Sequence, residues 1–338
     1  MMFSKAISSI LLILTLFISG CIDIEISDLG LIDSISVNQD GSPRGMALSM
    51  DENIYVTDFK GNQFLKIAEN NIEGSSVSWP AEGILFTSKL NNLWSVKIYS
   101  PKFENTDVLL QEFNAIRLPV LKLGNLSYMV LPEEEKLLGS INIYNLDSSR
   151  VTILFDSAYY DYEWLAGGKD IAAITVSNTI EGGFSGSVVI KNVDTLTEKV
   201  VFTGDFVECK DFLDTRKDGT IIFGSLGEIY LYNIGTEELS KWHGPTGYDF
   251  RLPPSVSSSL KGYILAKVSG IEEDWTGQLY LINLKDEFIP IPGWPIWIEE
   301  PLLVYVDLDC GDLYSINLDT QESENITKKY EEYGPKKN

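Results

Sequence analysis

The sequence of 338 residues holds a single histidine, His243. A Ser-His-Asp or Cys-His site would have to use this imidazole as its base. His243 stands in Trp242-His243-Gly244-Pro245, which we expect to link two repeats, and no Gly-x-Ser-x-Gly motif accompanies it. Two other enzyme-like patterns, Ser258-Ser259-Leu260-Lys261 and Gly167-Gly168-Lys169, lack the helix that their chemistry needs. The sequence therefore favours a protein without a catalytic site of these classes.

Cysteine is also scarce, being present only at Cys21, Cys209 and Cys310. Cys209 and Cys310 lie far apart in the chain and show none of the close spacings of a metal site. They form either two buried thiols or one disulfide, whose geometry is demanding. We therefore expect no metal centre built on cysteine.

Positive charge is scarce, because 26 Lys and Arg face 49 Asp and Glu, which gives a formal net charge of −23. Such a chain repels the phosphates of nucleic acid and avoids broad contact with an anionic membrane surface. It permits cations or a basic protein as partners. The charge thus predicts no nucleic-acid function.

Long apolar runs are absent after residue 21, and the one before it is short. Lys5 precedes an apolar stretch from Ala6 to Phe17, which is too short to span a bilayer comfortably. The stretch ends in Ile18-Ser19-Gly20-Cys21, which resembles the lipobox of prokaryotic lipoproteins. The resemblance implies a signal peptide over residues 1–20, a lipid on Cys21, a tether over 21–30 and a cell-membrane location facing outside the cytoplasm. An uncleaved membrane anchor is the alternative, and it places the chain on the same side.

What is abundant is a repeated six-residue segment rich in β-branched and aromatic residues, which favour strands. The fifth position of each copy is residue 58, 97, 145, 192, 233, 283 or 317. The copies follow one another at about 45 residues, the length of one four-stranded propeller blade. The segments are Ile54–Phe59, Leu93–Ile98, Ile141–Leu146, Val188–Val193, Ile229–Ile234, Leu279–Leu284 and Leu313–Leu318.

Polar turns such as Asp194-Thr195 follow most copies, and a further strand such as Ile171–Val176 precedes them. Strand, turn, strand, loop and hairpin make four antiparallel strands per repeat. We therefore predict an all-β fold with a single β-propeller over residues 31–327, because closure of the ring protects the sheet edges. Seven four-stranded blades fit the count, and six are possible if the final unit merges with the N-terminal strand. The charged tail, residues 328–338, is expected to be disordered.

Two segments carry a resemblance to known families. Trp79–Ser88 with Leu93–Val96 looks like the propeller repeat of TolB and of the N-terminal domain of prolyl-oligopeptidase-type proteins. Pro43–Leu48 with Asn53–Asp58 is similar to an NHL repeat. The resemblance implies the propeller fold, and it implies little about function, since such propellers have many activities.

Candidate binding residues follow from the alignment of the repeats. The innermost strands should begin near one end of the ring axis, together with the loops between second and third strands, of which the longest are Pro132–Ser140, Asn178–Ser187 and Gly270–Gly277. Acidic loops with exposed aromatic residues would suit a protein or glycan partner, whereas in the plainer interpretation they are only solvated. The candidates are Arg44, Trp79, Arg117, Glu163, Lys210, Asp211, Arg251, Trp275 and Trp294.

A weaker pattern points to a metal ion. Asp307, Asp309 and Asp312 place three carboxylates around Gly311, as Ca²⁺ would require, although an ordinary Asp-Gly turn explains the same residues. We therefore expect no cofactor, with Ca²⁺ as the possible exception. The functional prediction is a non-catalytic binding or scaffold propeller, and the alternative is a divalent-metal-dependent, lactonase-like hydrolase with its site on the axis.

Overall fold

The structure is a computed structural model, in which part of the chain is described. The described residues are 34–37, 45–50, 52–58, 60–62, 64–69, 77–79, 83–100, 105–132, 138–207, 212–216, 218–251, 264–268, 279–282, 288–299, 302–307 and 312–333. Nearly all of them belong to antiparallel strands, and all the sheets are built in chain order from neighbouring strands. This confirms the all-β prediction.

Five sheets have four strands each. The first holds β1 (Ser34–Val37), β2 (Gly45–Met50), β3 (Asn53–Asp58) and β4 (Phe64–Glu69), and the second holds β5 (Val77–Ser78), β6 (Ile84–Leu90), β7 (Leu93–Ser100) and β8 (Asn105–Glu112). The others are β16 (Leu213–Thr215), β17 (Thr220–Ser225), β18 (Glu228–Asn233) and β19 (Glu238–Lys241); β20 (Tyr248–Arg251), β21 (Ile264–Val268), β22 (Leu279–Ile282) and β23 (Phe288–Ile291); and β24 (Trp294–Glu299), β25 (Leu302–Val306), β26 (Leu313–Asn317) and β27 (Ser323–Asn325).

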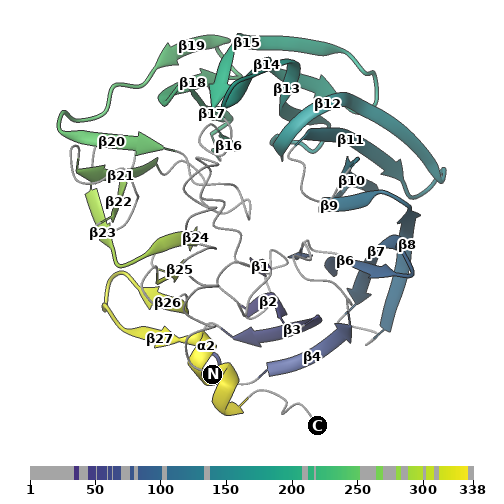
Figure 1. Ribbon diagram of the computed structural model, residues 1–338, viewed down its shortest axis with the longest axis vertical. Coiled ribbons are helices and arrows are strands. Elements are labelled where there is room, and N and C mark those ends of the chain that lie inside the picture. Colours follow the sequence, from purple (N-terminus) through teal and green to yellow (C-terminus); the bar gives the residue numbers. More distant parts are fainter. Residues whose placement is uncertain are drawn as a thin grey trace, which may run out of the picture.

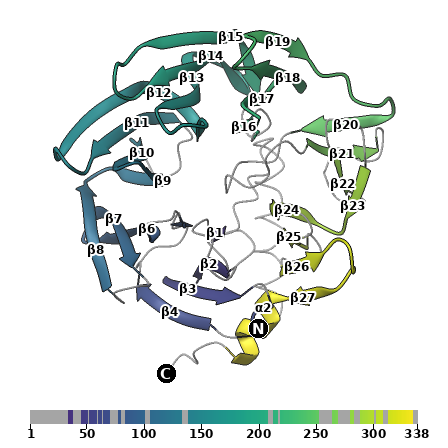
Figure 2. The ribbon, with the colours of Figure 1, turned by 180° about the vertical axis from the view of Figure 1, so that it is seen from behind.

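A sixth sheet has seven strands. It holds β9 (Ala115–Lys122), β10 (Asn125–Leu131), β11 (Leu138–Asn145), β12 (Arg150–Trp164), β13 (Asp170–Ile180), β14 (Gly183–Asn192) and β15 (Glu198–Val207). The sheets stand side by side around a common axis and form a ring, with β1, β9, β16 and β24 toward the middle (Figures 1 and 2). The protein is therefore a β-propeller.

The expected number of separate blades, seven or six, is wrong. The described residues form five four-stranded blades and the seven-stranded sheet. The reason lies in β12, whose first part pairs with β11 from Arg150 to Tyr159 and whose second part pairs with β13 from Ala158 to Trp164. The strand continues through a register shift between Ala158 and Tyr162, although a separate innermost strand was expected to begin near Glu163. Residues 150–164 contain no Gly or Pro to break the strand.

The described parts of the repeated hexamers lie on β3, β7, β11, β14, β18, β22 and β26, and the polar fifth residue has a structural role in five of the copies. The side-chain oxygens of Asp58, Asn145, Asn192, Asn233 and Asn317 accept hydrogen bonds from backbone N–H groups two to four residues later. Asn and Asp form such turns because their short side chains mimic a backbone carbonyl. The repeat therefore encodes the hairpin turn between third and fourth strands as well as the strand itself.

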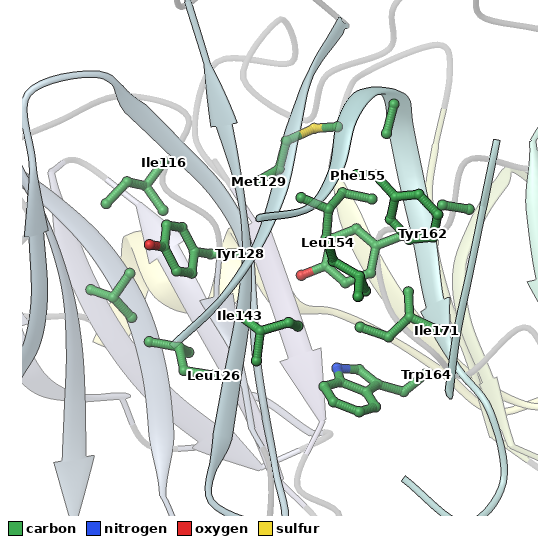
Figure 3. Packing of buried hydrophobic residues seen from close by; sticks show 14 of the residues in the cluster. Ile116, Leu126, Tyr128, Met129, Ile143, Leu154, Phe155, Tyr162, Trp164 and Ile171 are labelled. Atoms are coloured by element: carbon green, nitrogen blue, oxygen red, sulfur yellow. The ribbon is translucent and has the colours of Figure 1, made fainter. Parts of the chain in front are cut away.

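The core lies between the sheets. On the seven-stranded sheet, Tyr128 and Met129 are consecutive in β10 and point to opposite sides, as strand geometry requires (Figure 3). Tyr128 shares its cluster with Trp94 and Val96 of the β5–β8 sheet, while Leu154, Tyr162 and Trp164 pack on the side of Met129 (Figure 3). Packing between neighbouring sheets thus stabilises the ring all the way round.

The described chain ends in a helix, α2 (Ile326–Tyr333), which lies beside β27 and the first sheet (Figure 1). The expectation of disorder from Lys328 onward is wrong for residues 328–333, because Ile326 and Thr327 are buried and anchor the first turn. In the described part of the chain, no helix is long and apolar enough to cross a membrane. The signal peptide and tether expected over residues 1–30 lie outside the described residues.

Candidate recognition surface around the ring axis

The innermost strands bring four predicted residues to the inner part of the ring. Trp79 follows β5, Arg117 lies in β9, Glu163 lies in β12 and Trp294 begins β24. Arg117 and Glu163 thus belong to the seven-stranded sheet and the two tryptophans to two other sheets. Their exposed fractions are 7%, 9%, 8% and 3% in that order. All four side chains are therefore packed into the ring, and none of them is a solvent-facing group.

Arg117 is positioned by an aromatic ring. Its guanidinium carbon lies 5.0 Å from the centroid of the Trp94 ring, and Lys89 Nζ lies 5.2 Å from the same centroid. Lys89 and Glu112 are the cross-strand partners of Trp94 in the β5–β8 sheet. A cation over an aromatic face is stabilised by the quadrupole of the ring. Between the β5–β8 sheet and β9, the Trp94 ring therefore holds two positively charged side chains, Lys89 and Arg117, in position.

The inner strand β16 contributes a carboxylate that the sequence analysis missed. Asp214 is buried and its Oδ1 accepts a hydrogen bond of 2.7 Å from the backbone N–H of Thr215. The predicted residues were Lys210 and Asp211, which precede this strand in the sequence and lie outside the described residues. Asp214 follows Asp211 by three positions in the sequence, and this short spacing could have suggested the second position.

Two buried polar groups lie on the side of β10 that faces the β5–β8 sheet. Tyr128 and Asn142 are cross-strand partners, and neither Tyr128 Oη nor Asn142 Oδ1 has a hydrogen-bond partner among the described residues. Burial and the charge of Glu112 raise the pKa of Tyr128 to about 12, while the Asn142 side chain lies close enough to oppose the rise. Such groups are destabilising when they stay unpaired. The packed region between β10 and the β5–β8 sheet therefore contains two polar atoms that are shielded from solvent.

The end of the ring at which the innermost strands begin carries four exposed apolar side chains. Because strands alternate in direction, the inner strands begin at the same end at which the second-to-third-strand turns lie. Leu90 and Leu226 lie at such turns, and Phe113 stands just before β9. Ile180 lies at the β13–β14 turn, which is at the same end because the β12–β13 turn lies beside the β9–β10 turn, where Lys122 Nζ donates to the Leu165 carbonyl at 3.4 Å. The exposed fractions of Leu90, Leu226, Phe113 and Ile180 are 67%, 61%, 84% and 44% in that order. These apolar residues were not predicted, because acidic loops were expected at this end, although an apolar residue in a tight turn is itself unusual.

The expected loop Asn178–Ser187 is wrong, because β13 and β14 extend through it and leave only Glu181 and Gly182 as a turn. Ser177 Oγ donates to the Ser185 carbonyl at 2.9 Å, and the Ser187 and Thr203 hydroxyls lie 2.9 Å apart. These hydroxyl groups join β13 to β14 and β14 to β15, and their small side chains let the paired strands continue through the segment. The feature is thus a rigid hairpin, which presents Ile180 at its tip.

The candidate calcium residues flank a hairpin. The Asp307 N–H donates to the Asp312 carbonyl at 2.9 Å, and Asp312 Oδ2 accepts 2.7 Å from Asn325 Nδ2. Asp309 lies outside the described residues, and no group of three or more His, Cys, Asp or Glu side chains in the described ranges is placed to hold a metal ion. The calcium site stays a prediction.

The other candidates divide into two groups. His243 is exposed and lies between β19 and β20, as expected of a residue that links two repeats. Arg251 ends β20, and its side chain is not described. The remaining candidates and cysteines lie outside the described residues, namely Cys21, Arg44, Cys209, Lys210, Asp211, Trp275 and Cys310.

This geometry defines the class of protein as a β-propeller of antiparallel blades. No family model matches the sequence, and no curated protein matches it. In fold, the chain is similar to the propeller domain of the Trilobed protease from Pyrococcus furiosus, with 12% identity, a TM-score of 0.58 and coverage of 88% of this chain and 97% of that one.

Two further solved structures are similar in fold. One is a prolyl endopeptidase, with 13% identity, a TM-score of 0.57 and coverage of 89% of this chain. This chain spans only 50% of that enzyme's length. The other is an oligogalacturonate lyase in complex with manganese, with 9% identity, a TM-score of 0.54 and coverage of 88% and 84%. At such low identities the likeness shows the fold alone.

Proposed function

We propose that this protein is a lipid-anchored, extracytoplasmic binding module that holds a basic protein partner at the end of the ring where the innermost strands begin. One observation carries the proposal, namely the four exposed apolar side chains at this end, Leu90, Phe113, Ile180 and Leu226. Burial of apolar surface is the dominant favourable term in most protein association, and Phe113 is the most exposed of the four side chains.

The charge of the chain supports a basic partner. A formal net charge of −23 attracts a positively charged protein over long distances and raises the association rate at low ionic strength. A second copy of the same chain would be repelled by the same field. A glycan partner, which the sequence also suggested, is less well supported, since Trp79 and Trp294 are buried and offer no open aromatic face to a sugar.

The test compares two double variants of a soluble form that starts after Cys21. The first carries Leu90→Asp and Phe113→Asp at the proposed end, and the second carries Leu123→Asp and Leu196→Asp, which are exposed at the opposite end. Both add the same charge. We expect capture of a basic protein from the cell envelope by the parent and by the second variant, with loss in the first and in high salt. Equal capture by both variants would show that this end is not the binding surface.

The lipid anchor rests on Cys21 and its preceding small residues. Fatty-acid labelling of the intact chain should be lost in Cys21→Ser, and the variant should leave the membrane fraction. Labelling that persists in the variant would remove the anchoring proposal and leave the binding proposal untouched. The metal-dependent hydrolase rests on likeness of fold alone, and it stays a prediction without support of its own.

A further inference from the structure

The ring has one junction that the chain does not cross. Every other pair of neighbouring sheets is joined by the chain passing from one to the next. The first sheet, β1–β4, and the last, β24–β27, meet without such a connection, and in the described residues neither sheet takes a strand from the other. Packing between the two sheets holds this seam, where Met46 and Leu48 of the first sheet share one buried cluster with Val304 and Leu313 of the last. The other junctions have a covalent connection in addition, so a further contact across this seam would add stability where the chain itself adds none.

The helix α2 lies across the outside of this seam (Figure 1). The Tyr330 ring packs edge-on against Tyr55 of β3 and Phe64 of β4, with 5.2 Å between centroids in both cases. Tyr330 Oη also donates to Tyr55 Oη at 3.1 Å. Edge-to-face aromatic pairs contribute beyond their buried area. The helix that follows the last sheet therefore contacts β3 and β4, the third and fourth strands of the first sheet.

A lysine makes a second contact across the seam. Lys329 Nζ donates to the backbone carbonyl of Lys60, in the turn after β3, at 2.6 Å. The same ammonium lies 2.8 Å from Glu324 Oε2 of β27. One side chain thus bridges the last sheet and the first. Gly61 leaves room for it, since a Cβ at that position would lie 3.3 Å from both Ile326 and Lys329.

The helix is itself fixed to the last sheet. Asn325 caps it, with Oδ1 accepting 2.7 Å from the Lys328 N–H and Nδ2 donating 2.7 Å to Asp312. Thr327 Oγ1 accepts 2.8 Å from the Leu313 N–H, and Ile326 is fully buried. These contacts fix the first turn of α2 to β26 and β27. We infer that α2 is a clasp, anchored on β26 and β27, that closes the ring by holding β3 and β4.

Native-state hydrogen exchange of the full chain tests the clasp. Tyr330→Ala should speed exchange of the β3 and β4 amides on the order of tenfold or more, since the aromatic pairs and the hydroxyl pair are lost together. The amides of β17 and β18, on the far side of the ring, should keep their rates. Lys329→Ala should act at the same place, whereas Lys328→Ala, a matched control on the exposed side of the helix, should not.

Three results would overturn the inference. They are unchanged rates in β3 and β4 with faster exchange confined to β26 and β27, a uniform rise in all sheets, or equal effects of Lys329→Ala and Lys328→Ala. If Tyr330→Ala does not fold, Tyr330→Phe replaces it, because it keeps both ring contacts and removes only the hydroxyl pair. It should give a smaller rise at the same amides, and no rise there would count against the clasp.

Discussion

Asn192 Oδ1 accepts hydrogen bonds from the backbone N–H of Thr195 at 2.9 Å and of Asp194 at 3.1 Å. Its amide nitrogen meanwhile donates 2.9 Å to Asp170 Oδ1 on the neighbouring strand. One side chain thus shapes the turn between β14 and β15 and joins β14 to β13. The same acceptor geometry recurs at Asn233 and Asn317, so the turn is a property of the repeat.

Asn192→Ala should destabilise the protein by about 1–2 kcal/mol, since it removes several hydrogen bonds of modest net worth. Asn192→Asp keeps the acceptor but sets a carboxylate against Asp170. It should therefore be destabilised at neutral pH and recover as the pH falls toward 4. Chemical denaturation at the two pH values measures both effects, with Thr179→Ala on an exposed strand position as the control. An Asn192→Asp variant with no pH dependence would contradict the assigned amide orientation.

The residue that closes the same turn adopts a left-handed conformation. Leu196, Glu237 and Gln321 all have φ of 59°, and each follows its capping Asn by four positions. Side chains with a Cβ are disfavoured there, and glycine is not. Leu196→Gly should therefore raise stability by about 0.5–1 kcal/mol, or the melting temperature by about 1–3 °C. Leu196→Ala, which keeps the Cβ, should give no gain, and a gain of equal size would show that lost apolar exposure is the cause.

The local repeat made the blades predictable. Each hexamer forms a strand because the signals for it are local in the sequence, namely the alternation of its apolar residues and, for the turn that follows most copies, its polar fifth residue. The sequence did not predict that β12 would run unbroken past Tyr159, because a separate innermost strand beginning near Glu163 was inferred from the alignment of the repeats. The turn signal was in fact missing there, since residues 156–161 contain neither Gly nor Pro.

The candidate site was predicted less well, because it depends on contacts between distant segments. Trp79 and Trp294 were expected to face a partner, yet they are buried between sheets. Exposure is decided by the neighbouring blade, and a single strand carries no signal for it. The helix α2 was not predicted for a similar reason. Its charged sequence favours disorder, and the helix depends on the packing of Ile326 and Tyr330 against the cluster shared by the first and last sheets.

The buried hydroxyl of Tyr128 should cost stability. Its Oη has no hydrogen-bond partner among the described residues, and Phe would fill the same space. Tyr128→Phe should leave stability unchanged or raise it by about 1 kcal/mol at neutral pH. Because the folded pKa is raised to about 12, the wild type loses stability as the pH rises above the unfolded value of about 10, and the variant should lose less. Thermal melts at pH 7 and 11 decide this, and a clear loss in the variant at pH 7 would mean that an ordered water satisfies the hydroxyl.

Asp58 occupies the turn position that Asn holds in the later repeats, and it should make the first blade sensitive to acid. Partial burial alone would raise its pKa, but hydrogen bonds from Asn62, Lys60 and Gly61 outweigh burial and hold the pKa below its usual value. The Asn62 side chain and the Lys60 N–H contact its carboxylate at 2.8 and 2.9 Å.

A depressed folded pKa stabilises the protein above the unfolded pKa of about 3.9, and this contribution is lost as the pH falls through the folded value. Asp58→Asn should be less stable than the wild type at pH 7, because a neutral acceptor binds the same donors less strongly. The difference between the two melting temperatures should shrink between pH 5 and pH 3. Asp107→Asn, which makes the same change of charge at an exposed position of β8, serves as the control. A constant difference across this range would mean that the Asp58 charge is not what holds the turn.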